Sequence, residues 1–396
     1  MTPEDIAAVS HASLLPHLSA LGITRLADIT GLDRVGVPVA LAVRPMGRAL
    51  AVNQGKGLTL SVAKISAILE AAEQAAAEAH RLPLFYGTAA QRRQSHRLAD
   101  TALLPKRQGS PFHEHYPILW VAARGMRTGE EVLVPYELVH SDFTFPQPAG
   151  SGCFVQSTNG LAAHFKRDGA MLHGLLEVIE RDQLALLERR DPSRHTIDLA
   201  TVRDPQMRAL LRRCEGLGLL VVALDATGDF GVPTISCRVM DREADGAAMA
   251  HAAEGSAARP TAEGAFTAAL LEALQARLAF ISGTRDDLHP ADYEPQDTSD
   301  ELHRLERLND ASRSGRTLAE IGEQLWSRLH ARTESLLGQL QERVIALTGE
   351  EPLTVDFPAP AAEIAVLRVL APGLETAPHP AHVPGPRLSA VARTAA

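Results

Sequence analysis

The chain has 396 residues, of which 45% are hydrophobic and 22% are charged, a balance typical of a globular protein rather than a disordered one. Its length accommodates one large domain or two. The net charge is −9 and there is no basic run, which argues against electrostatic binding of nucleic acid. We see no signal-peptide pattern, no apolar stretch of about 18 residues that would span a membrane, and no metal or disulfide pattern among the three cysteines. The sequence therefore predicts a cytoplasmic protein without nucleic-acid or membrane partners.

Strand and helix patterns alternate along most of the chain. Residues 1–30 are predicted to form short helices, 242–260 a loop, and the Pro-rich tail from Thr376 irregular structure. Strands are predicted at 38–45, 50–53, 118–126, 131–140, 217–227, 233–241, 353–357 and 365–372. Helices are predicted at about 60–80, 168–190 and 261–281, and within 301–349. Because the strands come in pairs between helices, the pattern favours an α+β fold with antiparallel sheets, in two similar halves around a central cleft.

Two Glu-x-x-Glu pairs, about a hundred residues apart, are the most informative motif. The first is Glu70 and Glu73, and the second is Glu177 and Glu180; each pair lies on a predicted helix that follows a glycine turn. At positions i and i+3, both carboxylates of a pair share one helix face. A polar residue, Ser66 or His173, stands four positions before each pair, and the apolar stripe runs just beside the acids.

Like charges placed in this way repel unless a cation neutralises them. Mg²⁺ is the natural candidate because it accepts a few carboxylates together with phosphate oxygens. Two such helices facing each other would hold a metal-bound polyphosphate, and Lys56 in the Gly-Lys-Gly triplet 55–57 could contact a phosphate. The alternative is that both pairs are ordinary solvated helix faces. The sequence contains no Walker A motif, Rossmann fingerprint or kinase loop, so a nucleotide would have to be bound by a different arrangement of residues.

An ordered series of segments resembles the YcaO family over roughly residues 20–375. The series is GLDRVGVPVALAVRP, QGKG, SAILEAAE, GSGCFVQSTNGLAA, GLLEVIERD and LLEALQARLAFISGTRDDL. The resemblance implies a YcaO-like domain at 31–375, between an N-terminal helical segment (1–30) and a Pro-rich C-terminal tail (376–396). It also implies ATP and Mg²⁺ as cofactors. The implied activity is phosphorylation of a peptide backbone amide, followed by azoline formation with a side-chain nucleophile or thioamide formation with external sulfide.

The resemblance also implies roles for individual residues. Glu70, Glu73, Glu177 and Glu180 match the metal-binding acids of the family. The positions expected to contact the nucleotide are Lys56, Ser66, Arg181, Gln275 and Arg277. For Arg181 and Arg277 the structural alternative is a salt bridge to a nearby acid.

The sequence departs from the family pattern at the nucleotide-binding segment after STNGLA. The family usually has Gly-Asn and then an acid about four positions later, whereas this chain has His164, Phe165 and Gly169. Losing two or three neutral hydrogen bonds would weaken nucleotide binding by about 1–3 kcal/mol, at about 1 kcal/mol each. The Phe165 ring could fill the pocket, stack on the base, or belong to the core and face away.

Two functions therefore compete: an ATP-dependent peptide thioamide synthase or cyclodehydratase, and a degenerate YcaO-like docking subunit of a peptide-maturation complex. The opening and the GSGCF segment look most like the family branch that works beside TfuA-type proteins and is linked to thioamide formation. About 30 residues precede the matching region, so no leader-reading domain is expected. The expected partners are thus a peptide substrate and a TfuA-type or other accessory protein, with a homodimer as a further expected assembly.

Overall fold

A computed structural model describes residues 11–79, 82–242, 251–294, 298–322, 333–358, 361, 364–376 and 381–394. Its strands are β1 (Arg25–Asp28), β2 (Val39–Val43), β3 (Val52–Lys56), β4 (Leu84–Gly87), β5 (Ile118–Gly125), β6 (Glu131–Pro135), β7 (Leu161–His164), β8 (Leu219–Asp225), β9 (Thr234–Asp241), β10 (Ala253–Ala258), β11 (Leu353–Asp356) and β12 (Ala365–Leu370). Its α-helices are α2 (His11–Leu14), α3 (Leu60–Glu78), α4 (Ala89–Arg92), α5 (Arg167–Leu187), α6 (Pro205–Gly216), α7 (Ala262–Ser282), α8 (Ser299–Ser312), α9 (Leu318–Gly322), α10 (Thr333–Thr348) and α11 (Pro386–Thr394).

The first structural unit is an antiparallel sheet in the order β1-β2-β3, covered by α3. Thr59 caps α3 because its side chain accepts a hydrogen bond from the backbone N–H of Val62. Gly55 lets the helix touch the strand: a Cβ at this position would stand 2.7 Å from the carbonyl carbon of Ser66 and would overlap the neighbouring helix backbone. Only glycine permits this close approach.

A second unit repeats this construction with β10-β9-β8 and α7. Thr261 caps α7 by accepting from Gly264, and a Cβ at Gly255 would stand 2.7 Å from the carbonyl carbon of Glu272. Gly255 in β10 therefore corresponds to Gly55 in β3, and Glu272 corresponds to Ser66. The sequence pattern predicts that the two acidic helices, α3 and α5, are equivalent in the two halves. In the structure the repeated sheet-and-helix unit makes α3 equivalent to α7 instead.

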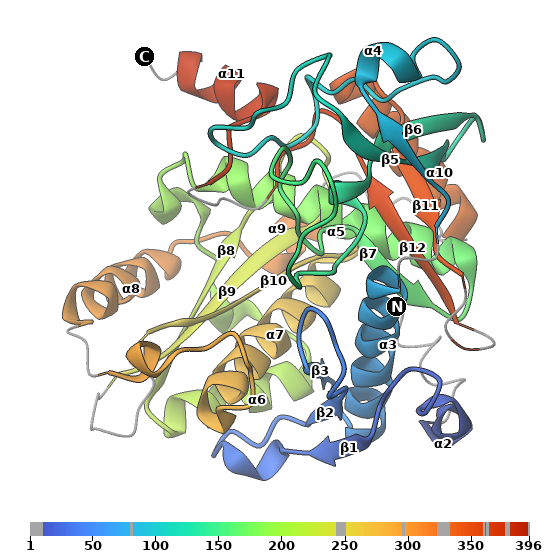
Figure 1. The fold of residues 1–396 in the computed structure, drawn as a ribbon. Helices are drawn as coiled ribbons and strands as arrows, with labels where there is room; N and C mark the ends of the chain where they lie inside the picture. The colour runs from blue at the N-terminus through green and yellow to red at the C-terminus, as the bar shows by residue number, and fades with distance from the viewer. Residues whose placement is uncertain are drawn as a thin grey trace.

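The third unit is a six-stranded antiparallel sheet in the order β4-β5-β11-β12-β7, with β6 paired to β5. Helix α5 packs on β12 and β7, and it also contacts β9 and β10 of the second unit. Helix α3 runs from the small N-terminal sheet, at the bottom of Figure 1, toward β7 and β12. The α+β class with antiparallel sheets is thus confirmed, and each of the helices α3, α5 and α7 also contacts a strand of a neighbouring unit: β7, β10 and β3, respectively.

Four sequence predictions need correction. Residues 25–28, predicted as helix, form β1, and residues 253–258, predicted as loop, form β10. The tail, predicted to be irregular, contains α11. Helix α7 is long and apolar enough to span a membrane by length and composition, although no such stretch was expected. Its apolar residues nevertheless pack in a core cluster with β8, β9 and β10, as in the core helix of a globular protein.

Candidate nucleotide and metal site

Helix α3 carries the first acid pair, and both carboxylates are half-buried. Oε1 of Glu73 accepts a hydrogen bond from the backbone N–H of Ala163 in β7 at 2.7 Å, so the middle of α3 is tied to the large sheet. Burial raises the pKa of Glu70 to about 7, although Lys56 acts to lower it. Burial, followed by the charge of Glu70, raises the pKa of Glu73 well above its ordinary value. A bound cation would therefore stabilise the ionised pair.

Helix α5 carries the second pair, but its two acids have different surroundings. Glu177 is 21% exposed, and burial raises its pKa to about 7 against the lowering effect of Arg181. Glu180 is buried, and both of its oxygens are already engaged by β10. The Ser256 hydroxyl donates to Oε1 at 2.6 Å, and the backbone N–H of Ala258 donates to Oε2 at 3.0 Å. Glu180 therefore fixes α5 against β10, and fewer of its lone pairs remain for a metal.

The two pairs lie within electrostatic range of each other. The charge of Glu177 contributes to the raised pKa of Glu73. Glu272 of α7 is a fifth acid of this group, because its charge contributes to the raised pKa of both Glu70 and Glu177. Burial acts to raise the pKa of Glu272, but its ion pair with Lys56, with Nζ and Oε2 at 2.9 Å, acts together with the charges of Arg181 and Arg259, and the pKa is lowered. The group thus joins acids of all three helices.

Cations surround these acids. Arg181 lies 3.8 Å from Glu177 and 3.6 Å from Glu180. Arg368 of β12 is fully buried, and burial lowers its pKa to about 10, while Glu177 and Glu73 oppose that shift. Its guanidinium donates to the carbonyl oxygens of Val139, Ser157 and Asn159.

Sequence reasoning missed Arg368 and two further arginines, because nothing in their local pattern marks them. Arg259 and Arg285 flank the two ends of α7. The charge of Arg259 lowers the pKa of Glu272, and that of Arg285 lowers the pKa of Glu70.

The predicted nucleotide-contacting residues divide into two groups. Lys56 and Arg181 lie among the acids, and Ser66 stands partly exposed one turn before Glu70. Gln275 is half-buried, and its Oε1 is a buried acceptor that finds no hydrogen-bond partner among the described residues.

Arg277 is different, because it lies in the core and is paired there. It is 4% exposed and forms ion pairs with Asp33, at 3.3 Å, and with Asp241. These contacts match the structural salt-bridge alternative, because its guanidinium already has anionic partners in the core.

The three departures from the family pattern form a local packing unit. The buried ring of His164 lies over Gly169: a Cβ at position 169 would stand 2.6 Å from Cγ of His164 and closer still to Nδ1. Nδ1 of His164 accepts from the backbone N–H of Lys166 at 3.0 Å. Phe165 is half-buried against the hydrophobic cluster of the large sheet. Packing against this cluster is what the alternative of a core residue predicts.

The donor set fits Mg²⁺ held together with phosphates rather than by protein alone. Among the described residues, no three His, Cys, Asp or Glu side chains are arranged to hold a metal ion. Mg²⁺ is usually bound by one or two carboxylates, with phosphate oxygens and water completing the shell. Half-buried carboxylates with raised pKa values on two facing helices supply that kind of partial shell. When bound, the ion would neutralise phosphate charge.

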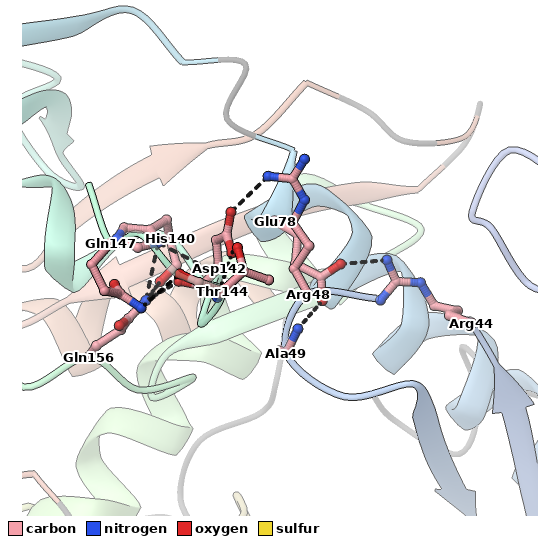
Figure 2. Close-up of polar contacts among 9 residues, drawn as sticks. All are labelled: Arg44, Arg48, Ala49, Glu78, His140, Asp142, Thr144, Gln147 and Gln156. Carbon is pink, nitrogen blue, oxygen red and sulfur yellow. Dashed lines mark hydrogen bonds and ion pairs between the residues drawn. The ribbon is translucent and has the colours of Figure 1, made fainter. Parts of the chain in front are cut away.

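The C-terminal end of α3, beyond the acids, is fixed by a polar network (Figure 2). Glu78 is buried and accepts hydrogen bonds from Nη2 of Arg44 at 2.8 Å and from the backbone N–H of Ala49 at 3.0 Å. Arg48, on the same loop between β2 and β3, pairs with the buried Asp142 at 2.8 Å. An acidic helix is thus anchored through a separate buried acid that lies outside the site.

The raised pKa of Glu177 predicts a pH dependence. With a pKa of about 7 in the folded state and about 4.5 when unfolded, this group keeps its proton longer in the folded protein. The stability that the folded state gains by holding this proton is fully present below pH 4.5, and it is lost as pH rises through about 7. Glu177→Gln should therefore raise the metal-free free energy of unfolding at pH 8 by about 3 kcal/mol and change it little at pH 4.5. Urea unfolding at both pH values measures this, and an equal effect at both would contradict it.

Sequence comparisons identify the family. The protein-family model described as YcaO cyclodehydratase, ATP- and Mg²⁺-binding, matches residues 54–375. The chain is 33% identical over 383 residues to an uncharacterized protein in the tfuA 3′ region of Rhizobium leguminosarum bv. trifolii, covering 93% of this chain and 87% of that one. It is 32% identical over 364 residues to an uncharacterized protein of Methanothermobacter thermautotrophicus, covering 90% and 91%.

Solved structures agree in fold. YcaO from Methanopyrus kandleri, bound with AMPPCP and Mg²⁺, matches with a TM-score of 0.67 at 22% identity, covering 95% of each chain. A heterocyclase in complex with substrate and cofactor matches with a TM-score of 0.71 at 20% identity; the match covers 93% of this chain but only 52% of that one. Because the family model spans most of the chain, this protein belongs to the YcaO family of ATP- and Mg²⁺-binding cyclodehydratases.

Proposed function

We propose that this protein uses ATP and Mg²⁺ to phosphorylate a backbone amide of a ribosomally made peptide, giving a thioamide or an azoline. The observation that carries the proposal is the meeting of carboxylates from α3 and α5 with Lys56 and Arg181 at the junction of the three helices. The relative encoded in a tfuA 3′ region favours the thioamide product, because the TfuA-associated branch is linked to it.

Each group has a role in this proposal. Glu70, Glu73 and Glu177 would hold Mg²⁺, and Glu180 would add a ligand while keeping α5 on β10. Lys56 and Arg181 would contact the phosphates, because cations beside a transferring phosphoryl group stabilise its charge. Ser66 and Oε1 of Gln275 would bind the rest of the nucleotide.

The proposed reaction has two steps. The amide oxygen attacks the γ-phosphorus of ATP, and ADP leaves. A sulfide, or a Cys, Ser or Thr side chain of the peptide, then adds to the amide carbon, and phosphate leaves with the original amide oxygen. In this proposal Lys56 and Arg181 would hold the phosphoryl group in both steps, and the protein would supply position and charge.

The degenerate docking subunit remains the competing function, because His164 and Gly169 have replaced polar nucleotide contacts with a packed pair. Calorimetry with Mg²⁺ and either ATP or AMPPCP separates the two. The enzyme proposal expects saturable binding that requires Mg²⁺, with slow release of phosphate from ATP. No binding of either nucleotide at millimolar concentration would favour the docking subunit.

We further predict that efficient peptide modification needs a TfuA-type or other accessory protein. The chain is acidic overall, and the description of the family model that it matches names ATP and Mg²⁺ binding. With ATP and a sulfur source, the protein alone should modify a precursor peptide at least tenfold more slowly than it does with its partner. Mass spectrometry of the peptide measures the rate, and full conversion without a partner would refute the idea. A homodimer and a cytoplasmic location stay predictions.

A further inference from the structure

Three consecutive residues of α5 face three different neighbours. Glu180 is bonded to β10, and Arg181 lies beside the acids of the site. Asp182 is fully buried, and its Oδ1 accepts hydrogen bonds from the backbone N–H of Glu375 at 3.0 Å and from Nε of Arg387 at 2.8 Å. The position of the site acids on α5 therefore depends on a contact at the next residue of the helix. That contact is made by the C-terminal segment, meaning residues 375–376 and 381–394.

The C-terminal segment is itself ordered around a buried acid. Glu375 is 1% exposed, and its carboxylate accepts three backbone hydrogen bonds, from Gly385 at 2.8 Å, Arg387 at 2.9 Å and Leu388 at 3.0 Å. A carboxylate at this end satisfies free N–H groups of α11 and complements its dipole. Leu388 then packs on Ala185 and Leu186 of α5. The segment is thus a fixed strap across α5.

Arg387 joins the strap to two elements. Besides Asp182, its Nη2 donates to both oxygens of Asp229, at 2.8 and 2.9 Å, in the connection between β8 and β9. Its guanidinium also lies 5.5 Å from the ring centre of Phe230. The side chain is only 13% exposed, so loss of its charge would leave the fully buried Asp182 carboxylate without a cation.

Resting on the proposed function, we infer that Arg387, acting through Asp182, is a positioning residue for the metal-binding carboxylates of α5. It does for α5 what Arg44 does for α3 through Glu78: each acidic helix is held by an arginine that pairs with a separate buried acid. Arg387 touches neither nucleotide nor metal in this scheme. It sets the register of α5, and with it where Glu177 and Arg181 stand relative to α3.

The test compares Arg387→Gln, Arg387→Lys and a matched control, Arg343→Gln. Nη1 of Arg343 also donates to this connection, to the backbone carbonyl oxygen of Asp229 at 3.0 Å, but among the described residues Arg343 makes no hydrogen bond or ion pair to α5. Binding of Mg²⁺ with AMPPCP is measured by calorimetry on the full chain. We expect Arg387→Gln to weaken binding at least fivefold, Arg387→Lys to recover part of the loss, and Arg343→Gln to stay within twofold of the wild type. Unchanged affinity in Arg387→Gln would overturn the inference, even if its melting temperature falls.

A second measurement keeps this inference separate from the proposed function. If the wild type binds no Mg²⁺ and AMPPCP, the proposed function fails, and hydrogen exchange of the α5 amides decides the positioning role. Exchange in α5 that is at least fivefold faster in Arg387→Gln than in Arg343→Gln would support it, and equal exchange would overturn it. If Arg387→Gln does not fold, Arg387→Lys carries both comparisons.

Discussion

Glu70→Gln is expected to reduce ATP turnover at least a hundredfold while leaving the fold intact and more stable without ligand. The amide cannot supply the charged ligand that Mg²⁺ requires. In the metal-free protein, however, the substitution removes a carboxylate whose pKa burial has raised to about 7, and so relieves the cost of ionising it. The free energy of unfolding at pH 8 should rise by about 3 kcal/mol. Phosphate release and urea unfolding measure the two effects, with Glu215→Gln on the exposed face of α6 as control.

Glu180→Gln should lose turnover as well but should lower stability, and here the structure changes the expectation from sequence. Repulsion between clustered like charges, taken alone, predicts that neither Glu70→Gln nor Glu180→Gln lowers the melting temperature of the metal-free protein. Glu180, however, accepts from both Ser256 and Ala258, and an amide has only one oxygen to offer to two donors. We expect a loss of about 1 kcal/mol, the usual value of one hydrogen bond, partly offset if the Ser256 hydroxyl turns to accept. Equal, positive stability changes in the two variants would contradict this distinction.

The contrast between these acids shows what the sequence could reveal. Spacing of three residues placed each pair on one helix face, and the helices α3 and α5 formed where the apolar pattern indicated. The same spacing could not show that Glu180 is bonded to β10, because β10 is built from small residues, Ala253–Ala258, that lack a strand pattern. Its short side chains are needed where α7 crosses the strand at Gly255.

Long-range ion pairs were the other part that sequence reasoning could not reach. Arg277 sits in a segment that matches the family, yet it pairs with Asp33 and Asp241 in the core. Arg368 has no polar neighbour in its strand pattern, yet the fold places it within electrostatic range of Glu73 and Glu177. Which arginine meets which acid depends on how the three sheets join, and that is a property of the tertiary structure rather than of any local spacing.

The second large effect is expected at Gly169. Gly169→Glu alone should destabilise the protein by about 3 kcal/mol or more, at the upper end of the usual cost of overpacking. The new Cβ would collide with the ring of His164, which is buried and cannot move aside freely. His164→Gly together with Gly169→Glu should recover at least half of the loss, because the glycine vacates the volume that the glutamate needs. Urea unfolding of both single variants and the double variant gives the coupling energy directly.

This coupling also determines how the nucleotide hypothesis must be tested. Restoring the family pattern with Phe165→Asn and Gly169→Glu alone would leave the His164 ring in place and so confuse misfolding with lost binding. The informative protein carries all three changes, His164→Gly, Phe165→Asn and Gly169→Glu. If the packed pair is what weakens nucleotide contacts, the triple variant should bind Mg²⁺ and ATP at least tenfold more tightly than the wild type, since two or three recovered hydrogen bonds contribute about 1 kcal/mol each. A folded triple variant with wild-type affinity would show that the exchange at positions 164 and 169 affects packing alone.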